Sequence, residues 1–230
     1  MQIARLELVH VTMPLVVPFA SAHSVRNERQ LFLVKVTTTD DVVGWGECAS
    51  EAIAGYSAET LSVSADKLRN EIVPRLNAIN SADGASEVMR EVEGATFARA
   101  SVYQAMLDAE LRTAGITLAQ HLKPWSRAVR PGVVVGLQDN IADSIKLMLQ
   151  YVDEGYGRIK FKIEPGRDRE VLLAVRQALG VGFEVQVDAN GAYNRDDFDL
   201  LQSLDEFRLR MIEQPLSPDD LEGSAALAAL

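Results

Sequence analysis

From about residue 131 onward, short apolar strand patterns alternate with longer amphipathic helix patterns. Strands separated by helices pair in parallel through right-handed crossovers, so four such units in succession predict an α/β fold with a parallel sheet. Each unit takes about 25 residues, as expected for a strand, a helix and two short loops. The expected strands are 133–136, 158–163, 183–187 and 208–212, and the expected helices are 141–152, 167–179, 195–204 and one opening near 217–221.

The first half of the chain has a different order of predicted elements, with strands first and helices after them. Residues 1–50 predict a three-stranded antiparallel meander whose strands include 31–36 and 42–47, with a loop at residues 18–24. Residues 58–124 predict helices. The expected helices run from a cap at Ser57 or Thr60 to Pro74, from just after Ser86, and from 97 to 112. A break at 123–127 then predicts two domains, 1–125 and 126–230.

Composition excludes several classes of protein. The chain has 47% hydrophobic and 24% charged residues, which is typical of a globular protein, and its single cysteine, Cys48, excludes a disulfide framework. The net charge of −10 disfavours nucleic acid as a partner. No apolar run reaches the roughly 18–20 residues of a membrane span, and the N-terminus lacks a signal-peptide pattern. We therefore expect a cytoplasmic protein that acts on a small molecule rather than on a membrane.

Polar side chains stand where three of the predicted strands end: Lys160 and Lys162, then Asp188 and Asn190, then Glu213. The step from Lys162 to Asp188 is 26 residues and the step to Glu213 is 25. Each step equals one unit, so these side chains should meet at the carboxyl edge of the sheet. That edge carries the chemistry both in (β/α) barrels and in open doubly wound sheets.

The chemistry of this set is that of proton abstraction beside a metal. Two carboxylates from neighbouring strands suit a hard cation such as Mg²⁺, with Mn²⁺ as the alternative. Lys160 and Lys162 lie on one face of their strand, and crowding two cations is expected to lower the pKa of at least one. A lysine with a lowered pKa can act as a base near neutral pH. Together these groups fit removal of a proton α to a carboxylate through an enediolate.

Each residue also has a structural interpretation. The lysines can be surface charges of an edge strand, Asp188 and Glu213 can be helix N-caps, and Asn190 can serve a turn. Lys162, Asp188 and Glu213 follow one another at steps of one strand–helix unit, and this regular spacing favours the functional interpretation over three independent structural ones.

Several motifs resemble a known family. They are Arg158–Gly166 (RIKFKIEPG), Val187–Tyr193 (VDANGAY), Ile212–Leu216 (IEQPL), Gly44–Cys48 (GWGEC) and Leu107–Leu111 (LDAEL). The sequence is similar to the enolase superfamily, muconate-lactonizing subgroup, and within it to the o-succinylbenzoate synthases and N-acylamino acid racemases. The resemblance covers the whole chain. It implies an N-terminal α+β capping domain followed by the first half of a (β/α)7β barrel. An open flavodoxin-like sheet is the structural alternative, although residues 135–138 lack its phosphate-binding Gly-rich loop.

The resemblance also implies roles for individual residues. Lys162 would be the catalytic acid and base, Lys160 its electrostatic partner, Asp188 and Glu213 metal ligands, and Asn190 a supporting residue. Residues 18–24 would form a loop that closes over the substrate, with Phe19, Ser21, His23 and Ser24 as its candidate contacts. For His23 an exposed loop position without a role is the alternative.

The implied activity is that of a hydro-lyase. A cyclohexadiene carboxylate would lose water in a syn dehydration to o-succinylbenzoate, a step of menaquinone biosynthesis. Within the family, N-acylamino acid racemase, dipeptide epimerase and muconate cycloisomerase are alternatives. A non-enzymatic alternative is a half-barrel remnant or binding module, although such a module has no need of the polar set at the strand ends.

The resemblance requires two further residues, a third carboxylate ligand and a second lysine, about 25 and 50 residues beyond Glu213. The sequence ends at Leu230, and a barrel takes about 250 residues. We therefore expect an N-terminal fragment of a protein of roughly 360–370 residues, which as a whole can form a homo-oligomer. The 230-residue chain alone is expected to be inactive and prone to aggregation because its last strand leaves an open edge.

Overall fold

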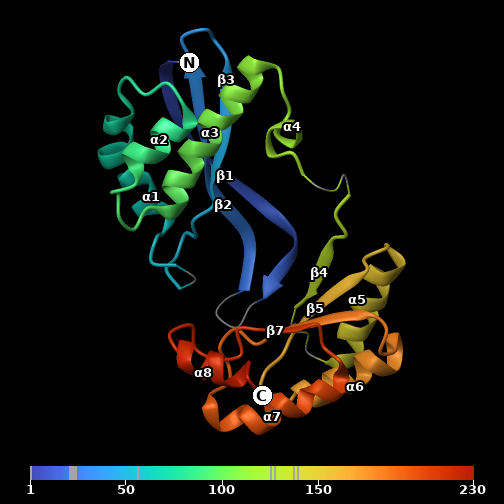
Figure 1. The fold of residues 1–230 in the computed structure, drawn as a ribbon. Helices are drawn as coiled ribbons and strands as arrows, with labels where there is room; N and C mark the ends of the chain where they lie inside the picture. The colour runs from blue at the N-terminus through green and yellow to red at the C-terminus, as the bar shows by residue number, and fades with distance from the viewer. Residues whose placement is uncertain are drawn as a thin grey trace. The chain divides into compact units, whose positions relative to one another are not determined.

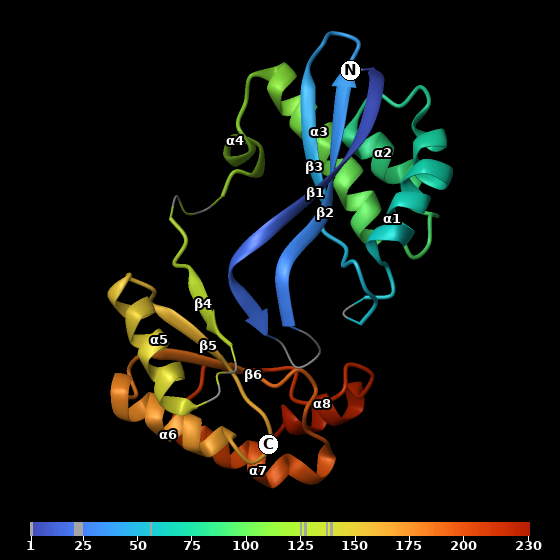
Figure 2. The same ribbon diagram turned by 180° about the vertical axis from the view of Figure 1, so that it is seen from behind.

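The computed structural model describes residues 2–20, 25–55, 57–124, 126, 128–136, 138 and 140–230. The chain forms two compact units, each with its own hydrophobic core. The N-terminal unit contains the residues up to Pro18 and from Arg26 to Arg127, and the C-terminal unit contains Phe19–Val25 and Ala128–Leu230. Figures 1 and 2 show the course of the chain from the two sides.

The N-terminal unit begins with a three-stranded sheet of order β1-β2-β3. Its strands are β1 (Ile3–Ala20), β2 (Val25–Thr38) and β3 (Val43–Cys48), and β2 pairs with β3 in antiparallel register. The strand β2 is much longer than the predicted strand 31–36. The predicted loop at residues 18–24 is wrong for its first three positions, because β1 continues through Pro18 to Ala20. Proline is tolerated there because β1 is an edge strand, which leaves one row of backbone groups without a ladder partner.

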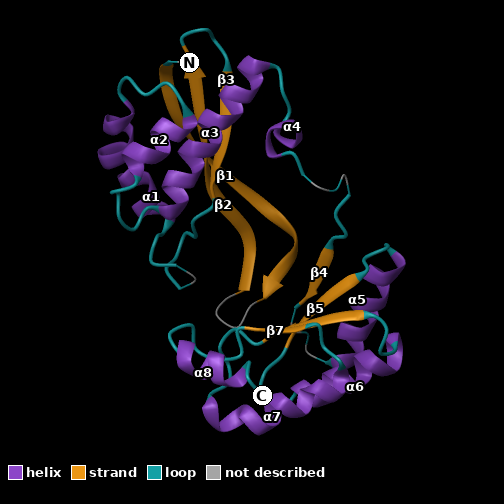
Figure 3. Ribbon diagram, viewed as in Figure 1, coloured by secondary structure: helices purple, strands orange, loops and turns teal. Residues whose placement is uncertain are grey.

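The helices of this unit are α1 (Leu61–Lys67), a π-helical turn (Leu68–Ile72), a 3-10 turn (Val73–Leu76), α2 (Ala82–Met89), α3 (Thr96–Ala114) and α4 (Leu118–Leu122). The helices α1, α2 and α3 lie against one face of the sheet, whereas α4 lies apart from it (Figure 3). Thr60 caps α1, as predicted, by accepting from the backbone N–H of Val63. The start predicted after Ser86 is wrong, since Ser81 caps α2 by accepting from Gly84. The helix α4 was not expected; its signal is a capping box of Thr117 and Gln120.

The helix α3 lies unusually close to β3. Gly44 and Gly46 face it, and a β-carbon on Gly46 would lie 1.9 Å from the carbonyl oxygen of Ser101. Side chains of the helix then close the outer edge of the strand: Gln104 accepts from the N–H of Glu47, and Asp108 accepts from the N–H of Trp45. The glycines therefore permit the approach that lets α3 satisfy the free edge of the sheet.

The C-terminal unit is a four-stranded parallel sheet of order β4-β5-β6-β7, as predicted. Its strands are β4 (Gly132–Val135), β5 (Arg158–Lys162), β6 (Glu184–Asp188) and β7 (Met211–Glu213). The helices are α5 (Ile141–Asp153), α6 (Asp168–Leu179), α7 (Phe198–Ser203) and α8 (Leu221–Leu227), with 3-10 turns at Arg195–Asp197 and Leu204–Phe207. Figures 1 and 2 show α5, α6 and α7 along one side of this sheet.

The core of this unit lies between the sheet and those helices. Ile159, Phe161, Val185 and Val187 are buried in it, together with Leu172 of α6. Because side chains alternate across a strand, the neighbours of these apolar residues point to the other face of the sheet. In the part of the chain that the structure describes, no helix is long and apolar enough to cross a membrane.

The glycine that faces α3 gives the first prediction. The substitution Gly46→Ala should destabilise the N-terminal unit by about 1–3 kcal/mol or more, because its methyl group can be placed only by moving α3 away from β3. The measurement is urea unfolding followed by circular dichroism. The matched control is Gly182→Ala, where an added β-carbon meets nothing within 4 Å. Equal midpoints for the two variants would contradict the role given to the close approach.

Candidate active site

The two lysines of β5 lie on the face of the sheet opposite the helices. Ile159 and Phe161 alternate with Lys160 and Lys162, and the two apolar side chains are buried against the helices. Lys160 and Lys162 are only partly covered, with 22% and 12% of their side chains exposed. Because successive side chains point to opposite faces of a strand, the two apolar residues lie on the dry face of the sheet and the two ammonium groups share the other face.

Strand register places the acidic residues beside these lysines. Lys162, Asp188 and Glu213 are the last residues of β5, β6 and β7. Lys162 is paired with Asp188, and Asp188 with Glu213, so the three form a row across the sheet. The sequence steps of 26 and 25 residues thus become lateral neighbours one strand apart.

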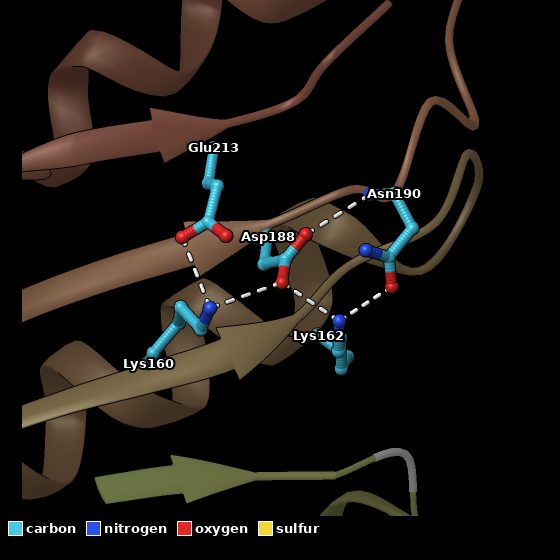
Figure 4. Close-up of polar contacts among 5 residues, drawn as sticks. All are labelled: Lys160, Lys162, Asp188, Asn190 and Glu213. Carbon is cyan, nitrogen blue, oxygen red and sulfur yellow. Dashed lines mark hydrogen bonds and ion pairs between the residues drawn. The ribbon is translucent and has the colours of Figure 1, made fainter. Parts of the chain in front are cut away.

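Hydrogen bonds join the five predicted residues into one cluster (Figure 4). The Nζ of Lys160 donates to Glu213 Oε2 at 2.9 Å and lies 3.1 Å from Asp188 Oδ2. The Nζ of Lys162 donates to the same Asp188 oxygen at 2.7 Å and also to Asn190 Oδ1. The other oxygen of Asp188 accepts from the backbone N–H of Asn190 at 3.1 Å. Asp188 is thus the centre of the cluster.

The charges of the cluster shift two pKa values. Burial by itself would raise the pKa of Asp188, but the hydrogen bonds from Lys162, Lys160 and the N–H of Asn190 outweigh it, and the pKa is lowered. Burial by itself would lower the pKa of Lys160, but its hydrogen bonds and attraction to Glu213 and Asp188 raise it. The expectation that crowding lowers a lysine pKa is therefore wrong for Lys160, because two carboxylates surround it.

The backbone around the cluster has an uncommon conformation. Asn190, Gly191 and Gln214 have φ values of 46°, 75° and 44°, in the left-handed region. Asn190 thus adopts the turn conformation that asparagine tolerates, and its side chain accepts from Lys162, while its role as a supporting residue of the site stays a prediction.

A buried pair near the cluster was not identified from the sequence. The hydroxyl of Tyr193 donates to Asp168 Oδ2 at 2.9 Å, and each of the two residues is only 3% exposed. Burial, and then the hydrogen bond and charge of Asp168, raise the pKa of Tyr193, which keeps its hydroxyl as a donor. Asp168 lies at the start of α6, where an acidic residue is common because it interacts favourably with the helix dipole. Nothing in the sequence near Asp168 indicates its partner 25 residues away.

The predicted substrate-closing loop is described only at its edge. The backbone of Phe19 belongs to β1, whereas Ser21, His23 and Ser24 lie outside the described residues. The structure therefore leaves the roles of these four residues as predictions.

The oxygen atoms of Asp188 and Glu213 have the chemistry that a hard divalent cation prefers. The two carboxylates end adjacent strands in register, and Glu213 is 38% exposed, which leaves it open to solvent and to a ligand. Within the described residues, no group of three or more His, Cys, Asp or Glu side chains could hold a metal ion. By their oxygen chemistry and their position at the ends of adjacent strands, Asp188 and Glu213 fit two ligands of such a cation.

Comparison with known proteins assigns the chain to a family. Residues 3–122 match the N-terminal domain model of mandelate racemase and muconate lactonizing enzyme, and residues 143–230 match the enolase C-terminal domain-like model. The chain belongs to the mandelate racemase and muconate lactonizing enzyme family. This family is part of the enolase superfamily, and the fold is its α/β fold, with an N-terminal capping domain and a partial barrel-like parallel sheet.

The relatives include proteins of two named activities. An N-succinylamino acid racemase from Amycolatopsis is 39% identical over 99% of this chain and 62% of its own length. An o-succinylbenzoate synthase from Listeria innocua is 31% identical over 99% of this chain and 61% of its own length. The chain thus spans about three fifths of the length of these curated relatives.

Solved structures show the same fold. An enolase superfamily member from Listeria innocua superposes with a TM-score of 0.94 at 31% identity, over 100% of this chain and 62% of its own. A muconate lactonizing enzyme from Pseudomonas fluorescens has a TM-score of 0.90 at 24% identity, over 99% and 64%, and so supports the fold alone.

The lowered pKa of Asp188 predicts how stability depends on pH. A carboxyl group whose pKa is lower in the folded state contributes stability above its unfolded pKa, about 3.9, and loses it as the pH falls toward the folded value. The variant Asp188→Asn cannot titrate, so its free energy of unfolding should fall less than that of the unchanged protein between about pH 5 and pH 2. The measurement is urea unfolding at a series of pH values.

The control for that series is Asp153→Asn, an exposed aspartate at the end of α5. It should follow the unchanged protein throughout. If the Asp188→Asn curve runs parallel to both over the whole range, the ion cluster does not account for the stability lost in acid.

Proposed function

We propose that the whole protein removes a proton α to the carboxylate of a small-molecule substrate and carries out the syn dehydration that forms o-succinylbenzoate. The observation that supports this is the cluster in which Lys162 lies within hydrogen-bond distance of Asp188 and Asn190, beside Lys160 and Glu213. Relatives named o-succinylbenzoate synthase support the choice of reaction. The lyase class, menaquinone biosynthesis and cytoplasmic location belong to the same proposal.

In this proposal each residue has a separate task. Lys162 takes the α proton at its Nζ, and the side chain of Asn190 orients that nitrogen. Lys160 places a second positive charge on the same face of the sheet, where it favours negative charge that develops on the substrate. Asp188 and Glu213 would hold a divalent cation, Mg²⁺ or Mn²⁺, which when bound stabilises the negative charge that the substrate carboxylate gains.

The proposed dehydration needs one acid-base group. Removal of the α proton by Lys162 leaves an electron pair that forms the new ring double bond as the hydroxyl group departs. The same lysine then returns the proton to the departing hydroxyl, so that water leaves and the ring becomes aromatic. Because the reaction is syn, the proton and the hydroxyl leave from one face, which a single lysine can serve.

Racemisation of an N-succinylamino acid is the second candidate, favoured by the 39% identity to the Amycolatopsis racemase. Racemisation requires a base on each face of the α carbon. Lys160 and Lys162 both come from β5, and among the described residues the cluster joins them on one face of the sheet. The second base is expected about 50 residues beyond Glu213, so the cluster is compatible with both reactions, and the choice of dehydration follows the relatives named o-succinylbenzoate synthase. Dipeptide epimerase and muconate cycloisomerase remain family alternatives, and a remnant or binding module without turnover is the non-enzymatic one.

The proposed base is tested by replacing it. In the whole protein, Lys162→Gln should reduce dehydration by about 10²–10⁴-fold, because the general base is lost while the side chain keeps its bulk. The rate is measured by absorbance of the aromatic product, with α-proton exchange in D₂O as a second assay. Lys146→Gln, an exposed lysine on α5, is the control and should keep full activity. Full activity of Lys162→Gln would rule out the proposed mechanism.

The proposed cation is tested by removal and by binding. Chelation should abolish turnover, and Mg²⁺ or Mn²⁺ should restore it. Glu213→Gln should weaken Mn²⁺ binding, measured by electron paramagnetic resonance, by at least the roughly 10–100-fold that loss of a supporting residue causes. Glu184→Gln, at the opposite end of the neighbouring strand β6, serves as the control and should leave the affinity unchanged. Unaltered binding by Glu213→Gln would show that the cation is held elsewhere.

A further inference from the structure

The buried hydrogen bond between Tyr193 and Asp168 takes no part in the proposed reaction. The tyrosine hydroxyl reaches Asp168 Oδ2 at 2.9 Å, and the other Asp168 oxygen accepts from the N–H of Arg169 at 2.6 Å. Both residues are 3% exposed. A buried carboxylate with so few donors depends strongly on each of them, so this bond should hold the two residues firmly together.

The bond connects the segments that follow three strands of the site. Asp168 begins α6, shortly after the Lys162 end of β5. Tyr193 ends the loop that follows Asp188 on β6. Its backbone N–H donates at 3.0 Å to the carbonyl of Pro215, which follows Glu213 on β7. Tyr193 is therefore tied to all three segments that carry the polar cluster.

The loop between Asp188 and Tyr193 is held by a regular series of backbone bonds. Ala189, Gly191 and Tyr193 donate to the carbonyls of Glu213, Gln214 and Pro215 at 3.0, 2.7 and 3.0 Å. These bonds enclose Asn190, whose left-handed conformation costs free energy and persists only where its surroundings determine it. Tyr193 is the last of the three donors, and its buried hydroxyl is hydrogen-bonded to Asp168, so it fixes the far end of the series.

We propose that Tyr193 is a positioning residue that acts through Asn190. Its bond to Asp168 anchors the 189–193 loop, the anchored loop holds Asn190 in its left-handed conformation, and Asn190 then orients the Nζ of Lys162. This inference rests on the proposed function for its kinetic consequence, but the anchoring of the loop can be measured without any turnover.

The kinetic test compares variants of the whole protein. Tyr193→Phe should lower kcat about 10–100-fold with KM changed by no more than about twofold, since a small misplacement of the base slows the chemical step more than substrate binding. Tyr151→Phe removes a hydroxyl from a tyrosine of α5 in the same unit, outside the site, and should leave both constants unchanged.

A double variant tests whether the effect passes through Asn190. If it does, Asn190→Ala combined with Tyr193→Phe should be no slower than Asn190→Ala alone, because the side chain through which the loop acts on Lys162 is then already absent. Multiplied losses in kcat would show that Tyr193 affects the rate by another route, and would overturn the proposal.

The structural test is hydrogen exchange of the backbone, followed by mass spectrometry. Tyr193→Phe should speed exchange in the peptide that contains Gly191 and Tyr193, while peptides of β4, α5 and the N-terminal unit keep their rates. Asp168→Ala removes the acceptor from the other side and should speed exchange in the same peptide. Tyr151→Phe should leave that peptide unchanged.

The outcomes separate this inference from the proposed function. If the unchanged protein shows no dehydration or α-proton exchange, the proposed function fails, and the exchange data alone decide whether Tyr193 anchors the loop. If exchange around Gly191 is unaltered in both variants, or rises equally across the whole C-terminal unit, the positioning role is overturned. The positioning role is supported if exchange rises only around Gly191, if kcat falls while KM stays nearly unchanged, and if the double variant is no slower than Asn190→Ala.

Discussion

The polar cluster depends on one nearly buried carboxylate placed between two ammonium groups. Asp188 is 3% exposed, and such a charge is costly to bury unless it is paired and hydrogen-bonded. Lys160, Lys162 and the N–H of Asn190 supply those bonds, so the carboxylate is stabilised where it is. Glu213 balances the second lysine, which leaves two positive and two negative groups in one cluster. The strand register that brings them together thus decides whether the site forms.

The same carboxylates serve two purposes that compete. Lys160 has a raised pKa because it is attracted to Glu213 and Asp188, and a proton held that firmly opposes basic chemistry. Those two residues are also the proposed cation ligands. If their oxygen atoms bind a cation, Lys160 loses both of its acceptors and Lys162 keeps only Asn190. Each lysine then faces another positive charge, which favours the unprotonated amine. The lysine–carboxylate ion pairs and cation binding therefore exclude each other, and the proposed base, Lys162, acts when the carboxylates hold the cation.

Much of this arrangement could be predicted from the sequence because spacing and strand period are local regularities. The steps between Lys162, Asp188 and Glu213 equal one unit each, and the alternation around Phe161 identifies the charged face. The start of the loop predicted at residues 18–24 was wrong because β1 continues through Pro18, which its edge position permits. The raised pKa of Lys160 depends on distances to two acids from other strands, which a sequence does not specify. For the same reason the Tyr193–Asp168 bond was missed.

The left-handed turn at Asn190 links the backbone to the chemistry. A glycine would adopt this conformation more easily, but it could not accept a hydrogen bond from Lys162. An asparagine meets both demands, at a cost in backbone strain that the bonds of the 189–193 loop must offset. Rigidity of that loop is therefore needed for the orientation of Lys162 as well as for stability. In the proposed mechanism, this is how a buried tyrosine and aspartate that take no part in the chemistry bear on its rate.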